Sequence, residues 1–160
     1  MTRFLKKGEI LQQVGDHVSD IYVVKSGLLR SYSLDHQGKE HIYMFASEDW
    51  IIADHQLDGE PAMLFIDALE DSEIELVPKS SVTPADMDAK KIMRRLSVLQ
   101  ERIIMLMSST AIERYEHFIK TYPDIVQRVP QKMIASYLGI TPEALSRAKK
   151  ERLNLTKSIS

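Results

Sequence analysis

Cysteine is absent from the 160 residues of this sequence, which also contain one tryptophan and six glycines. Disulfides, thiol catalysis, cysteine-ligated zinc and ordinary iron–sulfur clusters all require thiolates, and these residues supply none. No apolar run approaches the roughly 20 residues that span a bilayer. The first residues lack the apolar core of a secretory signal. We therefore expect a cytoplasmic protein without a membrane partner.

Signals for catalysis and metal binding are also missing. The five histidines do not recur at spacings typical of metal ligands. His36 and His41 flank a glycine turn and can point to the same side, but solvated hairpin positions explain them more simply. Neither a glycine-rich phosphate loop nor a nucleophile elbow occurs. The sequence predicts no enzyme, no metal site and no identifiable cofactor.

Charge is distributed unevenly, although the net charge is only −2. Residues 1–78 hold 6 Lys/Arg and 15 Asp/Glu, a balance of −9, whereas residues 79–160 hold 15 and 8, a balance of +7. A basic half suits a polyanionic partner, and an acidic half should avoid one. The alternative is that the basic residues only solvate a helix.

The acidic half has the pattern of short β-strands. Runs rich in β-branched and aromatic residues cover 21–24, 28–34, 41–45, 64–69 and 74–77. Turn signals that contain glycine separate the first four of these runs. This arrangement predicts a small closed or two-sheet β structure and excludes parallel βαβ units, for which the pieces are too short.

A helical period of apolar residues begins at about residue 84. Residues on one face recur at intervals of four, three, four and three, which makes a heptad seam. The seam consists of Ile92, Leu96, Leu99, Ile103 and Leu106, and we predict it to be the dimerisation surface. Met93, Ile104 and Met107 widen the apolar surface beside it. Packing within one chain is the alternative. A further helix is expected over 112–122, where Pro123 should end it.

Residues 129–150 have the spacing of a helix-turn-helix. Pro130 fits the first turn of a helix, and Gly139 fits the left-handed residue that ends it. Thr141 can cap a second, short helix that begins at Pro142 and turns Leu145 inward. The apolar stripe of the first helix is Met133, Ile134, Tyr137 and Leu138. A plain pair of core helices is the alternative.

Outward-facing polar residues make this segment a candidate reader of double-stranded DNA. A helix that presents Ser and Arg, with two lysines a turn later, suits base edges first and phosphates second. The predicted DNA-binding residues are Gln131, Lys132, Thr141, Glu143, Ala144, Ser146, Arg147, Lys149 and Lys150.

Several motifs together resemble the Crp/Fnr family of bacterial transcription regulators. They are KKGEIL, YVVKSGLLRSYSLDHQGKEHIYMF, DGEPAMLFIDALEDSEIELV and ERYEHFIKTYPDIVQRVPQKMIASYLGITPEALSR. The resemblance implies an α+β chain with a cyclic-nucleotide-binding-like jelly roll as sensor at 1–83, a dimerisation helix at 84–111 and a helix-turn-helix domain of the winged type at 112–160. The tail after Lys150 lacks the two strands of a full wing. A homodimer on a near-palindromic site is expected, with RNA polymerase as a possible further partner.

The resemblance also assigns roles to single residues. Glu143 and Arg147 stand where family members contact bases, while Pro142 replaces an Arg of the catabolite-activator branch. Ile52-Ala53 and Ala62-Met63 stand where nucleotide-binding members hold ribose and phosphate. Cyclic AMP is therefore not expected as effector, and neither a cluster nor haem has suitable ligands. An unknown small-molecule effector, a ligand-binding module with vestigial DNA binding, and a constitutive regulator with a structural β domain all stay open.

Overall fold

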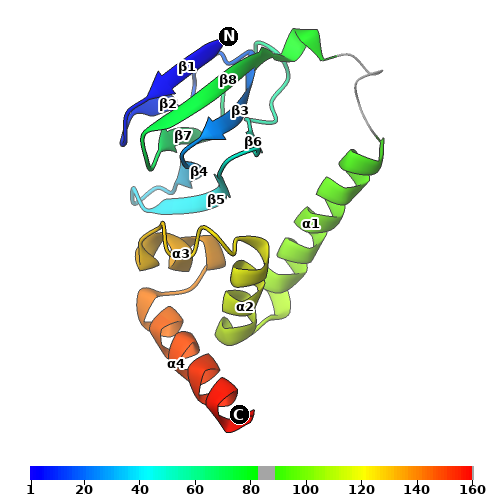
Figure 1. Cartoon of the computed structure of the whole chain (residues 1–160). Helices are drawn as coiled ribbons and strands as arrows, with labels where there is room; N and C mark the ends of the chain where they lie inside the picture. The colour runs from blue at the N-terminus through cyan, green and yellow to red at the C-terminus, as the bar shows by residue number, and fades with distance from the viewer. Residues whose placement is uncertain (83–88, 160) are drawn as a thin grey trace. The chain divides into compact units, whose positions relative to one another are not determined.

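The computed structural model describes residues 1–82 and 89–159. The chain divides into two compact units, Met1–Met87 with the strands and Asp88–Ser160 with the four helices of the described residues (Figure 1). The predicted domain boundary at 83/84 and residues 84–88 of the predicted dimerisation helix lie outside the described residues. Within the described ranges, no helix is both long and apolar enough to cross a membrane.

Antiparallel strands in two four-stranded sheets build the first unit. They are β1 (Thr2–Leu5), β2 (Ile10–Gln12), β3 (Asp20–Ser26), β4 (Leu29–Leu34), β5 (Glu40–Ala46), β6 (Ile51–Ile52), β7 (Phe65–Ala68) and β8 (Ser72–Pro78), followed by a 3-10 turn, η1 (Lys79–Ser81). One sheet has the order β1-β8-β3-β6 and the other β2-β7-β4-β5 (Figure 1). Successive strands repeatedly change sheets, as in a jelly roll, so the predicted two-sheet β structure is confirmed.

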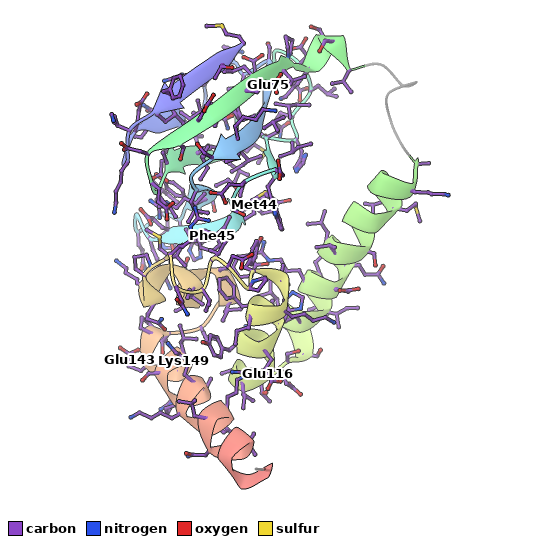
Figure 2. The ribbon with its side chains drawn as sticks, viewed as in Figure 1. Met44, Phe45, Glu75, Glu116, Glu143 and Lys149 are labelled. Carbon is purple, nitrogen blue, oxygen red and sulfur yellow. The ribbon has the colours of Figure 1, made fainter. Side chains whose placement is uncertain are left out.

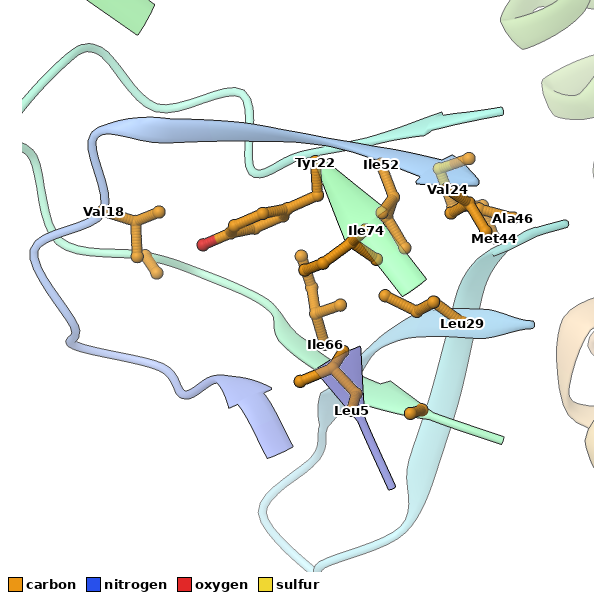
Figure 3. Packing of buried hydrophobic residues seen from close by; sticks show 12 residues of the cluster. Leu5, Val18, Tyr22, Val24, Leu29, Met44, Ala46, Ile52, Ile66 and Ile74 are labelled. Atoms are coloured by element: carbon orange, nitrogen blue, oxygen red, sulfur yellow. The ribbon is translucent and has the colours of Figure 1, made fainter. Parts of the chain in front are cut away.

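The apolar core lies between the two sheets (Figure 3). Alternate residues of each strand point inward, because successive side chains of a strand face opposite sides. Val24, Ile52 and Ile74 come from one sheet, and Leu29 and Ile66 from the other; each is fully buried. Burying an aliphatic side chain of this size stabilises the fold by about 1.5–3 kcal/mol. This core is the main source of stability of the β unit.

All five strands predicted from the sequence are present, as β3, β4, β5, β7 and β8. Three strands were missed. β1, β2 and β6 have only four, three and two residues, and the pairing of β2 shifts register between Ile10 and Gln12. Segments of two to four residues are too short to show an alternating apolar pattern. Whether they form strands depends on partners that are distant in the sequence.

Gly27, between β3 and β4, illustrates the predicted glycine turns. Its φ is +92°, and a Cβ there would lie 2.3 Å from Ser72 Oγ and 2.7 Å from Ser72 Cα. A side chain therefore fits neither the backbone conformation nor the space.

Four helices make up the described part of the second unit. They are α1 (Ala89–Ser108), α2 (Ala111–Thr121), α3 (Gln131–Leu138) and α4 (Pro142–Ile159). A capping box of Thr110 and Glu113 starts α2, which ends at Thr121 with Tyr122 as its C-cap residue, directly before Pro123 as predicted. The rings of Phe118, Tyr122 and Tyr137 lie 5.3–5.4 Å apart between centroids and tie α2 to α3. The predicted α+β class is confirmed.

Two expectations about the helix-turn-helix need correction. Pro130 is the N-cap residue of α3 rather than part of its first turn, with ψ at 146° and its carbonyl accepting from the N–H of Met133. The second helix is not short, because α4 has 18 residues and the tail from 151 to 159 continues it. That tail contains no glycine or proline, so no residue in it stops the helix.

Candidate DNA-binding surface

The turn between α3 and α4 has the geometry that the sequence predicted. Gly139 adopts φ 63° and ψ 32°, the left-handed conformation. Its N–H donates to the Ser136 carbonyl, and the Ile140 N–H donates to the Ala135 carbonyl. This pair of bonds is a Schellman motif, which ends α3 and redirects the chain toward α4.

The start of α4 is fixed by its cap. Thr141 Oγ1 accepts the N–H of Ala144 at 3.2 Å, and Pro142 is the first helical residue. Hydrogen bonds from its own backbone N–H and from the Thr141 hydroxyl lower the pKa of Glu143, and the charge of Arg147 one turn later adds to this. The Glu143 side chain is therefore a carboxylate at neutral pH and can only accept hydrogen bonds.

One face of α4 packs inward and the other carries polar side chains. Leu145 and Ala148 are buried. Four of the predicted DNA-binding residues on this helix are exposed: Glu143, Ser146, Arg147 and Lys150. Ala144 and Lys149 are half-buried at the border between the two faces. The helix thus presents a narrow row of polar groups from its first two turns.

Lys149 differs from its neighbours in orientation. Its Nζ lies 5.9 Å from the centroid of the Tyr115 ring on α2, a distance at which a cation and a ring attract each other. Figure 2 marks Lys149 on α4 together with Glu143. Lys149 is therefore the least available cation of the predicted set, a feature that its place in the sequence did not reveal.

The remaining predicted DNA-binding residues lie before α4. Gln131 and Lys132 open α3 and are exposed, and Thr141 is exposed in the turn. The first turn of a helix is electropositive, because its backbone N–H groups have no partner within the helix. These positions suit phosphate oxygens better than base edges.

Helix α1 carries an exposed apolar face. At about 100° per residue, Met93, Leu96, Ile103, Ile104 and Met107 share one side of the helix, and each is at least half exposed. Two members of the predicted seam, Leu99 and Leu106, flank this side and are less exposed. The side chain of Ile92 is outside the described part of the structure. The exposed face is thus shifted sideways from the predicted seam.

Inside the β unit, the positions that aligned with a nucleotide clamp are apolar or already satisfied. Ile52 and Ala62 are buried. The neighbouring Asp54 carboxylate is 3% exposed and accepts the N–H groups of Met63 and Leu64 at Oδ2, at 2.7 and 2.9 Å. A buried carboxylate persists only with such donors. Sequence reasoning missed Asp54, whose only signal is an acidic residue directly after the apolar run WIIA.

No group of three or more His, Cys, Asp or Glu side chains within residues 1–82 and 89–159 has an arrangement that could hold a metal ion. The functional interest of the chain therefore lies in its helices and in the β interior. A jelly roll followed by a helix with an exposed apolar face and a capped helix-turn-helix is the architecture of a class of two-domain transcription regulators.

Comparisons with known proteins agree with this class. The family model of the cyclic nucleotide-binding domain matches residues 2–84. The chain therefore belongs to this family, and its likenesses lie in the Crp/Fnr group.

Curated relatives and solved structures extend the likeness over most of the chain. The fumarate and nitrate reduction regulatory protein of Vibrio cholerae is 26% identical over 162 residues, which cover 89% of this chain and 65% of the relative. The transcriptional activator protein Anr of Pseudomonas protegens is 26% identical, with coverages of 91% and 67%. The chain therefore spans about two thirds of the length of these relatives.

In structure, FixK2 of Bradyrhizobium japonicum matches with a TM-score of 0.77 at 23% identity, covering 98% of this chain and 85% of that chain. A CRP/FNR-family transcriptional regulator of Thermus thermophilus also gives 0.77, at 18% identity, with coverages of 96% and 86%. These likenesses establish the fold.

Proposed function

We propose that this chain is a sequence-specific DNA-binding transcription regulator that acts as a homodimer in the cytoplasm. The observation that carries the proposal is the row of exposed polar residues on α4, held by the Gly139 turn and the Thr141 cap. The relatives named as regulatory and activator proteins, none of them described as an enzyme, support it.

Base reading is assigned to the first two turns of α4. Arg147 can donate two hydrogen bonds to guanine, and the ionised Glu143 can accept from cytosine. Ser146 lies beside them, and the side chain of Pro142 has no hydrogen-bonding group to offer in that row. Lys150, together with Gln131, Lys132 and Thr141, is proposed to bind phosphates, which set the register of the protein on the duplex.

The exposed apolar face of α1 is the proposed dimer contact. Large apolar side chains gathered on one exposed side of a 20-residue helix are typical of an interaction surface. A second α1 offers the same pattern, and a twofold pair would place two recognition helices about 34 Å apart on successive major grooves.

We also propose that cyclic AMP does not control this protein. Positions 52 and 62 hold Ile and Ala, neither of which has a positive charge for a phosphate. The amides of Met63 and Leu64 already donate to the Asp54 carboxylate. A phosphate at these amides would have to displace that carboxylate or meet its like charge. These observations also support a second candidate, a constitutive regulator with a structural β domain. Contacts with RNA polymerase or an unknown effector remain part of the proposal without a residue assigned.

Selection from a random DNA duplex library with the purified chain tests the function. We expect enrichment of a near-palindrome, which Arg147→Ala should bind about 10- to 100-fold more weakly, the effect of about 1–3 kcal/mol for a bidentate contact. Arg3→Ala is the matched control, because Arg3 lies on β1 and pairs with Glu9. Failure to enrich any sequence would overturn the proposed function. Enrichment that Arg147→Ala leaves unchanged would remove Arg147 from the reading surface.

A further inference from the structure

The C-terminal end of α3 leaves two backbone carbonyls unused by its own turn. The Schellman motif occupies the carbonyls of Ala135 and Ser136. The last four carbonyls of a helix have no partner within the helix, so those of Tyr137 and Leu138 must find partners elsewhere. Both partners are arginines from other helices.

Arg114, in the first half of α2, binds three carbonyls at once. Its Nη1 donates to Leu138 O at 2.9 Å, its Nη2 to Leu106 O at 2.8 Å and its Nε to Ser109 O at 3.0 Å. Leu106 lies in the last turn of α1, so the guanidinium joins the carbonyl ends of α1 and α3. Both ends carry partial negative charge, and a cation between them stabilises their approach.

Arg102 makes a second link from α1 to the same turn. Its Nη2 lies 3.4 Å from Tyr137 O, and its guanidinium carbon lies 4.0 Å from the centroid of the Tyr137 ring. A planar guanidinium can stack on a ring and donate sideways at the same time, which an ammonium cannot. The joint packs directly against Gly139, since a Cβ there would lie in ordinary van der Waals contact, 3.5 Å, with both Arg114 Nη1 and Leu106 Cδ2.

We propose that Arg114 and Arg102 form a joint that sets the orientation of the recognition helix α4 relative to α1. They are positioning residues that need not touch DNA. In a dimer built on α1, this orientation decides whether two α4 helices match two half-sites together. The inference rests on the proposed function. It adds two residues near the end of the dimer helix that fix how the recognition helix is oriented.

The test compares affinity for two DNA probes with the full chain. One probe is the palindrome enriched by the selection, and the other carries only one of its half-sites. In Arg114→Ala, we expect the ratio of the two affinities to fall at least about tenfold, or about 1.4 kcal/mol, while affinity for the single half-site changes little. Arg114→Lys should give a ratio between those of Arg114→Ala and the wild-type chain. Arg102→Lys should give a ratio below that of the wild-type chain. Arg3→Lys is the matched control.

The outcomes separate the joint from simpler roles. Equal weakening on both probes would mean that Arg114 only stabilises the helix-turn-helix, and would overturn the proposal. A ratio unchanged in both Arg114→Ala and Arg102→Lys, with a dimer confirmed by sedimentation, would overturn it as well. If Arg114→Ala does not fold by circular dichroism, the two lysine variants decide the matter. A wild-type chain that does not prefer the palindrome would overturn the proposed function, and the joint with it.

Discussion

Replacing Asp54 with alanine should destabilise the β unit strongly. The carboxylate accepts the N–H groups of Met63 and Leu64 at Oδ2 and that of Gln56 at Oδ1, at 3.1 Å. Gln12 Nε2 adds a contact of 3.5 Å from β2. Alanine removes every one of these acceptors and fills no new space. The segment between β6 and β7 would lose the group that holds it in place.

The magnitude follows from the donors left behind. A buried N–H without a partner costs about 1–3 kcal/mol, and the part-buried amides of Met63 and Leu64 both lose theirs. Part of this cost is offset, because the variant no longer buries a carboxylate. We expect the free energy of unfolding to fall by about 3 kcal/mol. With a urea m-value of about 1.5 kcal/mol/M for a unit of this size, the midpoint should shift by about 2 M.

Tryptophan fluorescence during urea unfolding measures this change in the full chain. Trp50 is the one tryptophan of the sequence, and it lies in the β unit, partly packed against the core. Asp58→Ala is the matched control, since Asp58 is exposed in a turn. If the two variants unfold within about 0.5 kcal/mol of each other, the argument that Asp54 is an internal ligand of these amides is refuted.

Four further outcomes are expected. Millimolar cyclic AMP should leave the Trp50 unfolding midpoint unchanged, whereas a ligand of the native state would raise it by mass action. Ile103→Asp places a charge at a position of the apolar face of α1 that is 58% exposed and should yield a monomer by sedimentation, while a persisting dimer would place the contact elsewhere. Gly139→Ala should cost about 1 kcal/mol of helix-unit stability by circular dichroism, because φ stays at +63°. Hydrogen bonds from the Thr110 backbone and hydroxyl lower the pKa of Glu113, so its capping contribution is present above the ordinary value of 4.5 and is lost as pH falls through the lower, folded value. Glu113→Gln should lack this acid-dependent loss in the same measurement.

Local sequence signals were sufficient to predict the elements whose structure depends on residues a few positions apart. The long strands β3, β4 and β5 follow from β-branched runs beside glycine turns, β8 follows from a β-branched run alone, and the turn at Gly139 follows from helix-ending chemistry. The row on α4 follows from the position of Leu145 relative to the cap at Thr141. Each of these rests on residues within a few positions of each other.

Contacts between distant parts of the chain were decided only by the tertiary structure. Asp54 meets the amides of Met63 and Leu64 nine and ten residues away, and Arg114 meets Leu138 across 24 residues. Lys149 turns toward Tyr115 instead of outward. An isolated acid or arginine in a sequence does not reveal its partner, because the partner depends on how completed elements pack. The sequence by itself thus determined the turn at Gly139 and the cap at Thr141, and it predicted the polar row of α4 that the proposed function assigns to DNA. Packing decided what holds that surface in place, because helix-end carbonyls and buried charges are satisfied only after the elements meet.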